Sequence, residues 1–246
     1  MANGEVGAHR SVGRVQPVLT AGATRAKYLH CVYTASASVA PMSVPAPCAQ
    51  RAASSSVPDE PLSAMLKTAT RSTHERLDQR LMALGIFDDR RDYLRFLQVQ
   101  AQFHSAVAAL YRRQDLPMPA TELGKHAQVL ADLQDLGAHP AAPTADAPLL
   151  ATAPLPVALG WWYVAEGSSM GAAVLLHHAA RVGLHEGFGA RHLAPAAAGV
   201  AAHWRSVRAA MDALALTDAQ RVQAATAASA AFEFVGRRVD EAFRNA

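Results

Sequence analysis

Cysteine is nearly absent from this chain of 246 residues, and its two cysteines, Cys31 and Cys48, both lie near the N-terminus. The rest of the chain therefore lacks the thiols that a disulfide framework or a cysteine-ligated metal site requires. Aromatic residues are scarce, at 6%, and no segment has the pattern of a β-strand. Alanine, the best helix former, is abundant instead, so the composition favours an all-α protein.

A strong charge of one sign is also lacking in most of the chain. The net charge of the whole sequence is +3, but residues 1–57 hold five basic residues against one acidic residue. Residues 58–246 therefore carry a net charge of −1. A nearly neutral body has no general attraction for a phosphate backbone, so we expect no nucleic-acid partner.

No long uncharged apolar run is present. The most apolar stretch, residues 155–182, is interrupted by charged or titratable residues, namely Glu166, His177, His178 and Arg181. Its uncharged segments are shorter than the roughly 18 residues that a membrane span needs, so it predicts a buried core helix. We therefore expect a soluble, cytoplasmic protein without a membrane partner.

Residues 1–58 are rich in alanine, serine, valine, proline and glycine and have no helical or strand period. We expect them to form a disordered, dispensable extension before a single domain of residues 59–246. No apolar block of signal-peptide length follows a basic start, so secretion is poorly supported. A start codon assigned too far upstream, with Met42 or Met65 as the true start, explains the segment at least as well as a targeting peptide.

From Pro58 onward, apolar residues recur with the 3.6-residue period of amphipathic helices. Residues 138–154, rich in proline and alanine, predict a loop. The predicted helices cover about residues 62–81 with Gly85 near the end, a segment from Asp88 or Asp89 to about residue 110, residues 120–136 before Gly137, residues 155–182, residues 199–214, and residues 217–243 after a cap at Thr217 and Asp218.

Gly167 and Gly171 stand out in the predicted helix of residues 155–182. Each costs roughly 1 kcal/mol relative to alanine in a helix interior, and their spacing of four places them on one helix face. Close packing of two helices is the commoner reason for such a pair. A flat ligand that lies directly against the bare backbone of a kinked helix is the more specific one.

His74 lies on the apolar face of the first predicted helix. A histidine in that place is more often a core residue than a metal ligand. Asp78, four residues later, can accept a hydrogen bond from the ring nitrogen that a metal does not use, which is typical of a histidine ligand. Both interpretations of His74 remain open on spacing alone.

Several other chemistries are excluded because their motifs are missing. The sequence has no His-Glu-x-x-His motif of zinc proteases, and no glutamate is followed three residues later by histidine, as di-iron bundles require. It also has no glycine-rich phosphate-binding or dinucleotide-binding motif. His177 and His178 are helical neighbours about 100° apart, so they cannot readily share one metal.

Three segments resemble a known family. Leu159–Val174 (LGWWYVAEGSSMGAAV) is similar to the distal helix of bacterial haem oxygenases, and Phe188–Leu193 fits the same order of segments. Thr70–Asp78 (TRSTHERLD) resembles the segment that carries the proximal histidine. The resemblance extends over about residues 62–243 and implies a single-domain, all-α haem oxygenase-like bundle in which haem lies between a proximal and a distal helix.

The resemblance implies that His74 is the axial ligand of haem iron and that Gly167, Ser168 and Gly171 lie on the oxygen-binding side. Haem would be both cofactor and substrate, with O2 and electrons from a ferredoxin or a flavoprotein reductase as co-reactants. The products would be biliverdin, carbon monoxide and iron. A glycine-lined oxygen side suits this reaction, because an acid–base side chain there would favour cleavage of the O–O bond.

The resemblance also implies roles for further residues, each of which ordinary packing or solvation explains as well. Lys67 and Tyr163 resemble a pair that anchors the haem propionates, which would favour cleavage at the α-meso carbon and the product biliverdin IXα. Gln100 and His104 would lie near the distal water network. Phe232 and Phe234 would be aromatic residues at the haem edge.

The chain also departs from its relatives. Asp78 stands where they usually have glutamate, so its bond to His74 is expected to be longer or water-mediated. Ala172 follows Gly171 where animal enzymes have a second glycine, and Ser168 replaces an acid, so protons must travel through water and other groups. Residues 240–246 (DEAFRNA) contain no hydrophobic anchor.

Two alternatives to an enzyme remain. The first is a haem-binding or haem-carrying protein of the same fold that does not degrade its ligand. The second is a helical scaffold without a cofactor. The sequence also leaves open the electron donor, the oligomeric state, and whether the reaction would serve iron release or bilin supply.

Overall fold

The computed structural model describes residues 60–117, 125–195 and 199–244. These residues form a bundle of helices without β-strands, as the helical period of the apolar residues predicts. The expected all-α fold is therefore confirmed, whereas the expected disorder of residues 1–58 lies outside the described residues. The helices are α1 (Leu62–Ala83), α2 (Arg90–Val107), the 3-10 helix η2 (Ala108–Arg112), α3 (His126–Asp135), α4 (Leu155–Gly167), α5 (Ser169–Ala180), the 3-10 helix η3 (Arg191–Leu193), α6 (Val200–Asp212) and α7 (Asp218–Ala242).

The helix ends follow from local sequence signals. The Asp89 side chain accepts a hydrogen bond from the backbone N–H of Asp92 and caps α2, as one of the two predicted caps. Thr217 caps α7 in a reciprocal pair with Gln220, a capping box. Gly85 follows α1 with a φ of +63°, a left-handed conformation that ends a helix without strain. The loop predicted for residues 138–154 contains no helix.

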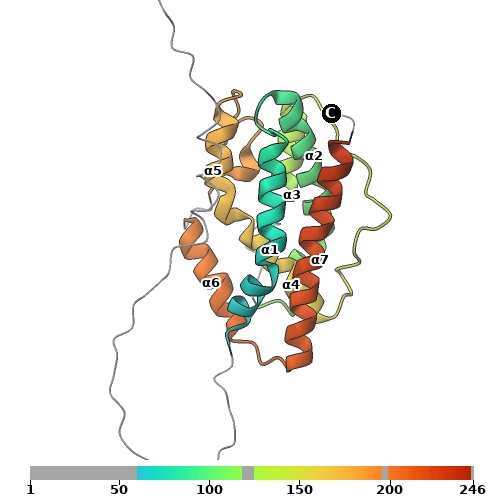
Figure 1. Ribbon diagram of the computed structural model, residues 1–246, viewed down its shortest axis with the longest axis vertical. Coiled ribbons are helices and arrows are strands. Elements are labelled where there is room, and N and C mark those ends of the chain that lie inside the picture. The colour runs from blue at the N-terminus through green and yellow to red at the C-terminus, as the bar shows by residue number, and fades with distance from the viewer. Residues whose placement is uncertain (1–59, 118–124, 196–198, 245–246) are drawn as a thin grey trace, which may run out of the picture.

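The centre of the bundle is the contact between α4 and α7. Helix α1 also packs on α7, and Figure 1 shows these two helices side by side. Gly160 of α4 lies directly against the backbone of α7. A Cβ atom at Gly160 would overlap the Ala224 carbonyl oxygen and would lie 2.6 Å from the Ala228 nitrogen. Ala224, Ala227 and Ala228 of α7 lie next to this glycine, and Ala225 and Ala231 of the same helix are also buried. Small residues on both helices thus allow two backbones to touch.

The helix predicted for residues 155–182, broken in character by Gly167 and Gly171, is present as two half-helices, since α4 ends at Gly167 and α5 begins at Ser169. Two features of this segment favour the break. Gly167 lacks the side chain that would restrict its backbone, and the Ser168 hydroxyl donates a hydrogen bond to the Ala165 carbonyl at 2.7 Å. That bond competes with the helical hydrogen-bond ladder. The segment ends two residues earlier than predicted, at Ala180.

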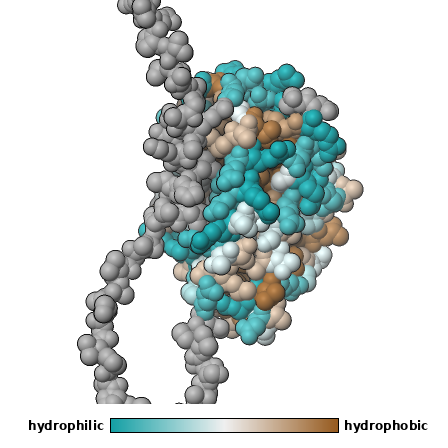
Figure 2. Space-filling view, viewed as in Figure 1, coloured by the Kyte–Doolittle hydropathy of each residue, from teal (hydrophilic) through white to brown (hydrophobic). Residues whose placement is uncertain are grey.

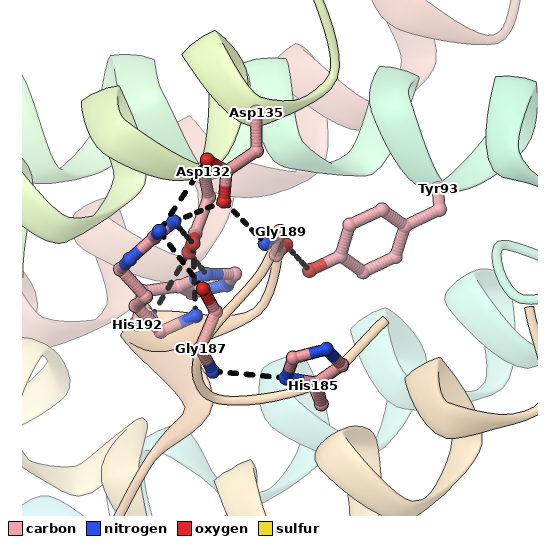
Figure 3. A network of polar contacts seen from close by, with 8 residues as sticks. Tyr93, Asp132, Asp135, His185, Gly187, Gly189 and His192 are labelled. Atoms are coloured by element: carbon pink, nitrogen blue, oxygen red, sulfur yellow. Dashed lines mark hydrogen bonds and ion pairs between the residues drawn. The ribbon is translucent and has the colours of Figure 1, made fainter. Parts of the chain in front are cut away.

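The segment that follows α5 is fixed by a buried polar network (Figure 3). Asp132 of α3 is fully buried. It accepts hydrogen bonds from the backbone N–H groups of Arg191 at 2.9 Å and His192 at 3.0 Å, and from His192 Nδ1 at 2.8 Å. Burial alone would raise the pKa of Asp132, but the hydrogen bonds from His192 and Arg191 outweigh it and hold this pKa below its usual range.

The same network reaches α2. The Tyr93 hydroxyl donates to the Gly189 carbonyl at 2.7 Å, and the Gly189 N–H donates to Asp135 at 2.8 Å. Arg191 forms a further ion pair with Asp135. Helices α2 and α3 therefore hold the turn after α5 in place. This turn fixes the position of the C-terminal end of α5.

In the part of the face that Figure 2 shows in colour, hydrophilic side chains alternate with hydrophobic patches. Within the described ranges, no helix combines the length and the apolar character that crossing a membrane demands.

We predict that Asp132→Ala lowers the free energy of unfolding by about 3 kcal/mol, because it leaves His192 Nδ1 and two backbone N–H groups buried without acceptors. Urea denaturation of the ligand-free protein measures this change. Asp132→Asn keeps one acceptor oxygen and should cost less. Glu233→Ala, at an exposed position of α7, is the control and should change stability by less than about 0.5 kcal/mol. A similarly small change in Asp132→Ala would contradict the proposed importance of this network.

Candidate functional site

His74 lies on α1 and is half-buried, with 33% of its side chain exposed. Its Nδ1 atom lies 3.3 Å from Oδ2 of Asp78, the contact that the spacing of four residues allows. The imidazole also meets the Phe232 ring of α7 edge-on, with ring centroids 5.3 Å apart. The ring is thus oriented by a carboxyl group from its own helix and an aromatic ring from another.

Burial controls the charge of this pair. It lowers the pKa of His74, against a smaller opposing effect of Glu75, so the imidazole is neutral near pH 7. Burial also raises the pKa of Asp78 to about 7, and the charge of Glu75 adds to that shift. A neutral imidazole is the form that can bind a metal. When Nδ1 donates to a carboxylate, the lone pair is on Nε2.

The two glycines of the predicted distal helix have different surroundings. A Cβ atom at Gly167 would touch the ring of Trp204 at 3.4 Å, whereas a Cβ atom at Gly171 would meet nothing within 4 Å. Helix packing explains the glycine at position 160, which the sequence did not single out, and in part Gly167. It does not explain Gly171, where the bare backbone borders open space.

These features fit a haem group. Iron in a porphyrin needs only one or two donors from the protein, and one neutral imidazole supplies the first. Phe232 beside His74 provides an apolar edge, and open space next to Gly171 allows a flat ligand to lie against backbone. His74, Phe232 and Gly171 are therefore the residues that could hold it.

The other residues that the sequence predicted for the haem site differ in how far they are buried. Lys67 is half-buried on the His74 helix, and Gln100 is half-buried on α2. Tyr163 is buried, with its ring 5.4 Å from that of Trp204. Ala172 is buried in α5. Phe234 is buried against Trp161, so of the two predicted aromatics the one that contacts His74 is Phe232.

His104 is buried on α2 beside Phe103. Its pKa is well below the usual value because of burial, with smaller contributions from the positive charges of Lys125, His192 and His126. Nδ1 of His104 and Nε2 of His192 are both buried and have no hydrogen-bond partner among the described residues. A buried ring nitrogen without a partner from the protein suits a bond to an ordered water molecule.

The sequence did not predict a second polar cluster, which lies next to Gly167. Glu166 accepts a hydrogen bond from the Tyr111 hydroxyl at 2.8 Å and another from His203 Nε2 at 2.6 Å. Burial raises the pKa of Tyr111 well above its usual value, and the charge and hydrogen bond of Glu166 add to it. A helical pattern cannot reveal this cluster, since its members come from η2, α4 and α6.

Comparison with known proteins gives a consistent result. The family model "Heme oxygenase" matches residues 60–241. Heme oxygenase PigA of Pseudomonas aeruginosa is 36% identical over 181 residues, which cover 72% of this chain and 91% of that protein. The NO- and CO-bound heme oxygenase from Neisseria meningitidis superposes with a TM-score of 0.70 at 34% identity, covering 76% of this chain and 94% of that one.

A heme oxygenase from Leptospira interrogans shares the fold at 18% identity, with a TM-score of 0.64, and is covered over its full length by 74% of this chain. The sequence resemblance, the helical architecture and the match over most of the chain agree with one another. This chain belongs to the haem oxygenase family.

Proposed function

We propose that this protein cleaves haem oxidatively to biliverdin and releases carbon monoxide and Fe2+, using O2 and electrons from a reductase or a ferredoxin. The observation that carries the proposal is the half-buried imidazole of His74, oriented by Asp78 and Phe232. Bound haem supplies the redox chemistry through its iron, and its ring is the substrate. We also propose a cytoplasmic location, since a reducing compartment suits a chain with few cysteines.

His74 holds the iron in this proposal, and Asp78 is a positioning residue. Asp78 accepts the hydrogen bond from Nδ1 and thereby directs Nε2 toward the metal. Aspartate is shorter than glutamate, and Nδ1 of His74 lies 3.3 Å from Oδ2 of Asp78, so the contact that orients the imidazole is a long one.

Gly167, Ser168 and Gly171 form the oxygen side of the site. Gly171 leaves space for the ligand beside its backbone. The Ser168 hydroxyl holds the break between the two half-helices through Ala165. None of the three positions carries an acid–base group, so we assign proton delivery to water molecules held by Gln100 and His104. The buried Nδ1 of His104 suits that role.

The seating of haem sets which carbon is attacked. We assign the propionate contacts to the ammonium group of Lys67 and the phenolic hydroxyl of Tyr163, and the apolar border to Ala172 and Phe234. This seating favours the α-meso carbon.

An aerobic assay with haem and a reductant tests the function. The enzyme should bleach the Soret band of bound haem and form biliverdin and carbon monoxide, which chromatography and gas trapping measure. A haem carrier would bind haem without bleaching it, and a scaffold would show no saturable titration. Either outcome would contradict the proposed function.

We predict that His74→Ala lowers the rate of haem degradation by at least about 100-fold, because the iron loses its protein ligand. The absorption spectrum of the haem complex should change with it, and added imidazole should restore part of the wild-type spectrum. His177→Ala, an exposed change on α5, is the control. Wild-type turnover in His74→Ala would show that a residue other than His74 binds the iron.

We predict that Gly171→Ala lowers the rate of haem degradation without lowering the stability of the ligand-free protein. The added methyl group meets no atom within 4 Å, so the ligand-free protein should be unchanged or more stable by up to about 1 kcal/mol. Turnover should fall by roughly tenfold, since the methyl group enters the space assigned to the ligand. Thermal unfolding and the haem assay measure the two effects, and undiminished turnover would show that Gly171 does not border the ligand.

We predict that the wild-type protein makes biliverdin IXα and that Lys67→Ala yields a mixture of isomers, because one propionate loses its charged partner. Chromatography of the products distinguishes the isomers. Lys67→Arg, which keeps the positive charge, should retain mainly the α isomer. Mainly β or δ product from the wild type would refute this seating.

A further inference from the structure

Few apolar side chains of helix α6 are fully buried. Of its thirteen residues, only Val207 and Met211 are fully buried, and Trp204 is partly buried against Tyr163 and the core. By contrast, α4, also of thirteen residues, buries nine. Figure 1 shows α6 at the periphery of the bundle, outside α1 and α4. Because two buried side chains and one partly buried tryptophan give α6 less apolar contact than α4 has, polar contacts contribute to holding α6 in place.

The first polar attachment lies at the start of α6. His203 donates through Nε2 to Glu166 at 2.6 Å, and Tyr111 holds the same carboxylate from the other side at 2.8 Å. The Glu166 side chain is only 11% exposed, so solvent screens this contact weakly. The next residue, Trp204, lies over Gly167. The first turn of α6 is thus fastened to the break between α4 and α5.

The second attachment lies at the last residue of α6. Asp212 accepts hydrogen bonds from the backbone N–H and from the hydroxyl of Ser63, both at 2.8 Å. Ser63 is in the first turn of α1, and the residue that precedes α1, Pro61, provides no side-chain cap. Asp212 therefore caps α1 from a different helix and complements the positive end of its dipole.

Together the two attachments join the helix that carries His74 to the break beside Gly167. We propose that α6 is a strap that sets the width of the haem site, and that Glu166, His203 and Asp212 are positioning residues that control how fast haem enters and leaves. The inference rests on the proposed haem site. Opening the site requires α6 to move away from α1 and from the break, which breaks both attachments.

The test compares Glu166→Ala, Asp212→Ala and the double variant of the full chain. Haem release is measured by transfer from the loaded protein to an excess of apomyoglobin. Loss of one buried charge-assisted attachment should speed release about tenfold, and loss of the partly exposed one should speed it roughly three- to tenfold. Because α6 breaks both contacts when it opens, the effects should multiply in the double variant.

Conservative variants separate positioning from simple destabilisation. Glu166→Gln keeps an acceptor for Tyr111 and Asp212→Asn keeps an acceptor for Ser63, so each should restore much of the slow release. Arg208→Ala, at an exposed position of α6, is the control and should release haem at the wild-type rate. Release within twofold of the wild type in both alanine variants, together with a lower free energy of unfolding, would overturn the proposal.

A second readout uses the ligand-free protein. Amide hydrogen exchange should be about tenfold faster in α6 of either alanine variant, with α7 unchanged, because α6 opens locally. Equal exchange in α6 of wild type and variants would show that the contacts do not hold the helix. If exchange changes as expected but wild-type protein binds no haem, α6 is held as described, and the haem site and its control by α6 are both wrong.

Discussion

Two helix backbones touch where Gly160 of α4 meets Ala224 and Ala228 of α7, and the rest of the molecule depends on this contact. It fixes α7, whose Phe232 ring orients His74, relative to α4, whose last turn leads into the break. A larger side chain at this point would separate the two helices and move the imidazole relative to the glycines. The geometry of the site therefore depends on the absence of side chains in the core.

Local sequence signals predicted the helices well, because capping and periodicity act over one or two turns. Asp89 and Thr217 lie at the helix starts that their chemistry indicated. The two glycines predicted a break in the helix of residues 155–182, but not which of them would mark it, since glycine and serine occur in continuous helices as well. The break directly follows Gly167, and the Ser168 hydroxyl there bonds the Ala165 carbonyl, a contact that only the three-dimensional structure reveals.

The contacts of the candidate site also differ in whether the sequence could predict them. The contact of His74 with Asp78 joins residues four apart on one helix, so spacing alone could predict it. The polar contacts that the sequence did not predict join residues far apart along the chain. Asp132 and His192 are separated by 60 positions, Glu166 and His203 by 37, and Ser63 and Asp212 by 149. Nothing in one sequence indicates which distant polar residues will meet.

The abundance of alanine explains why these distant contacts matter. An alanine-rich core lets helices approach closely, but each alanine buries little apolar surface, so the hydrophobic stabilisation of a peripheral helix is small. The central helices compensate by burying many residues, as α7 does, whereas α6 fully buries two and partly buries Trp204. For α6, charge-assisted hydrogen bonds carry a larger share of the positioning energy. A helix held in this way can be displaced without disturbing the core, which suits the edge of a site that must admit and release a large flat ligand.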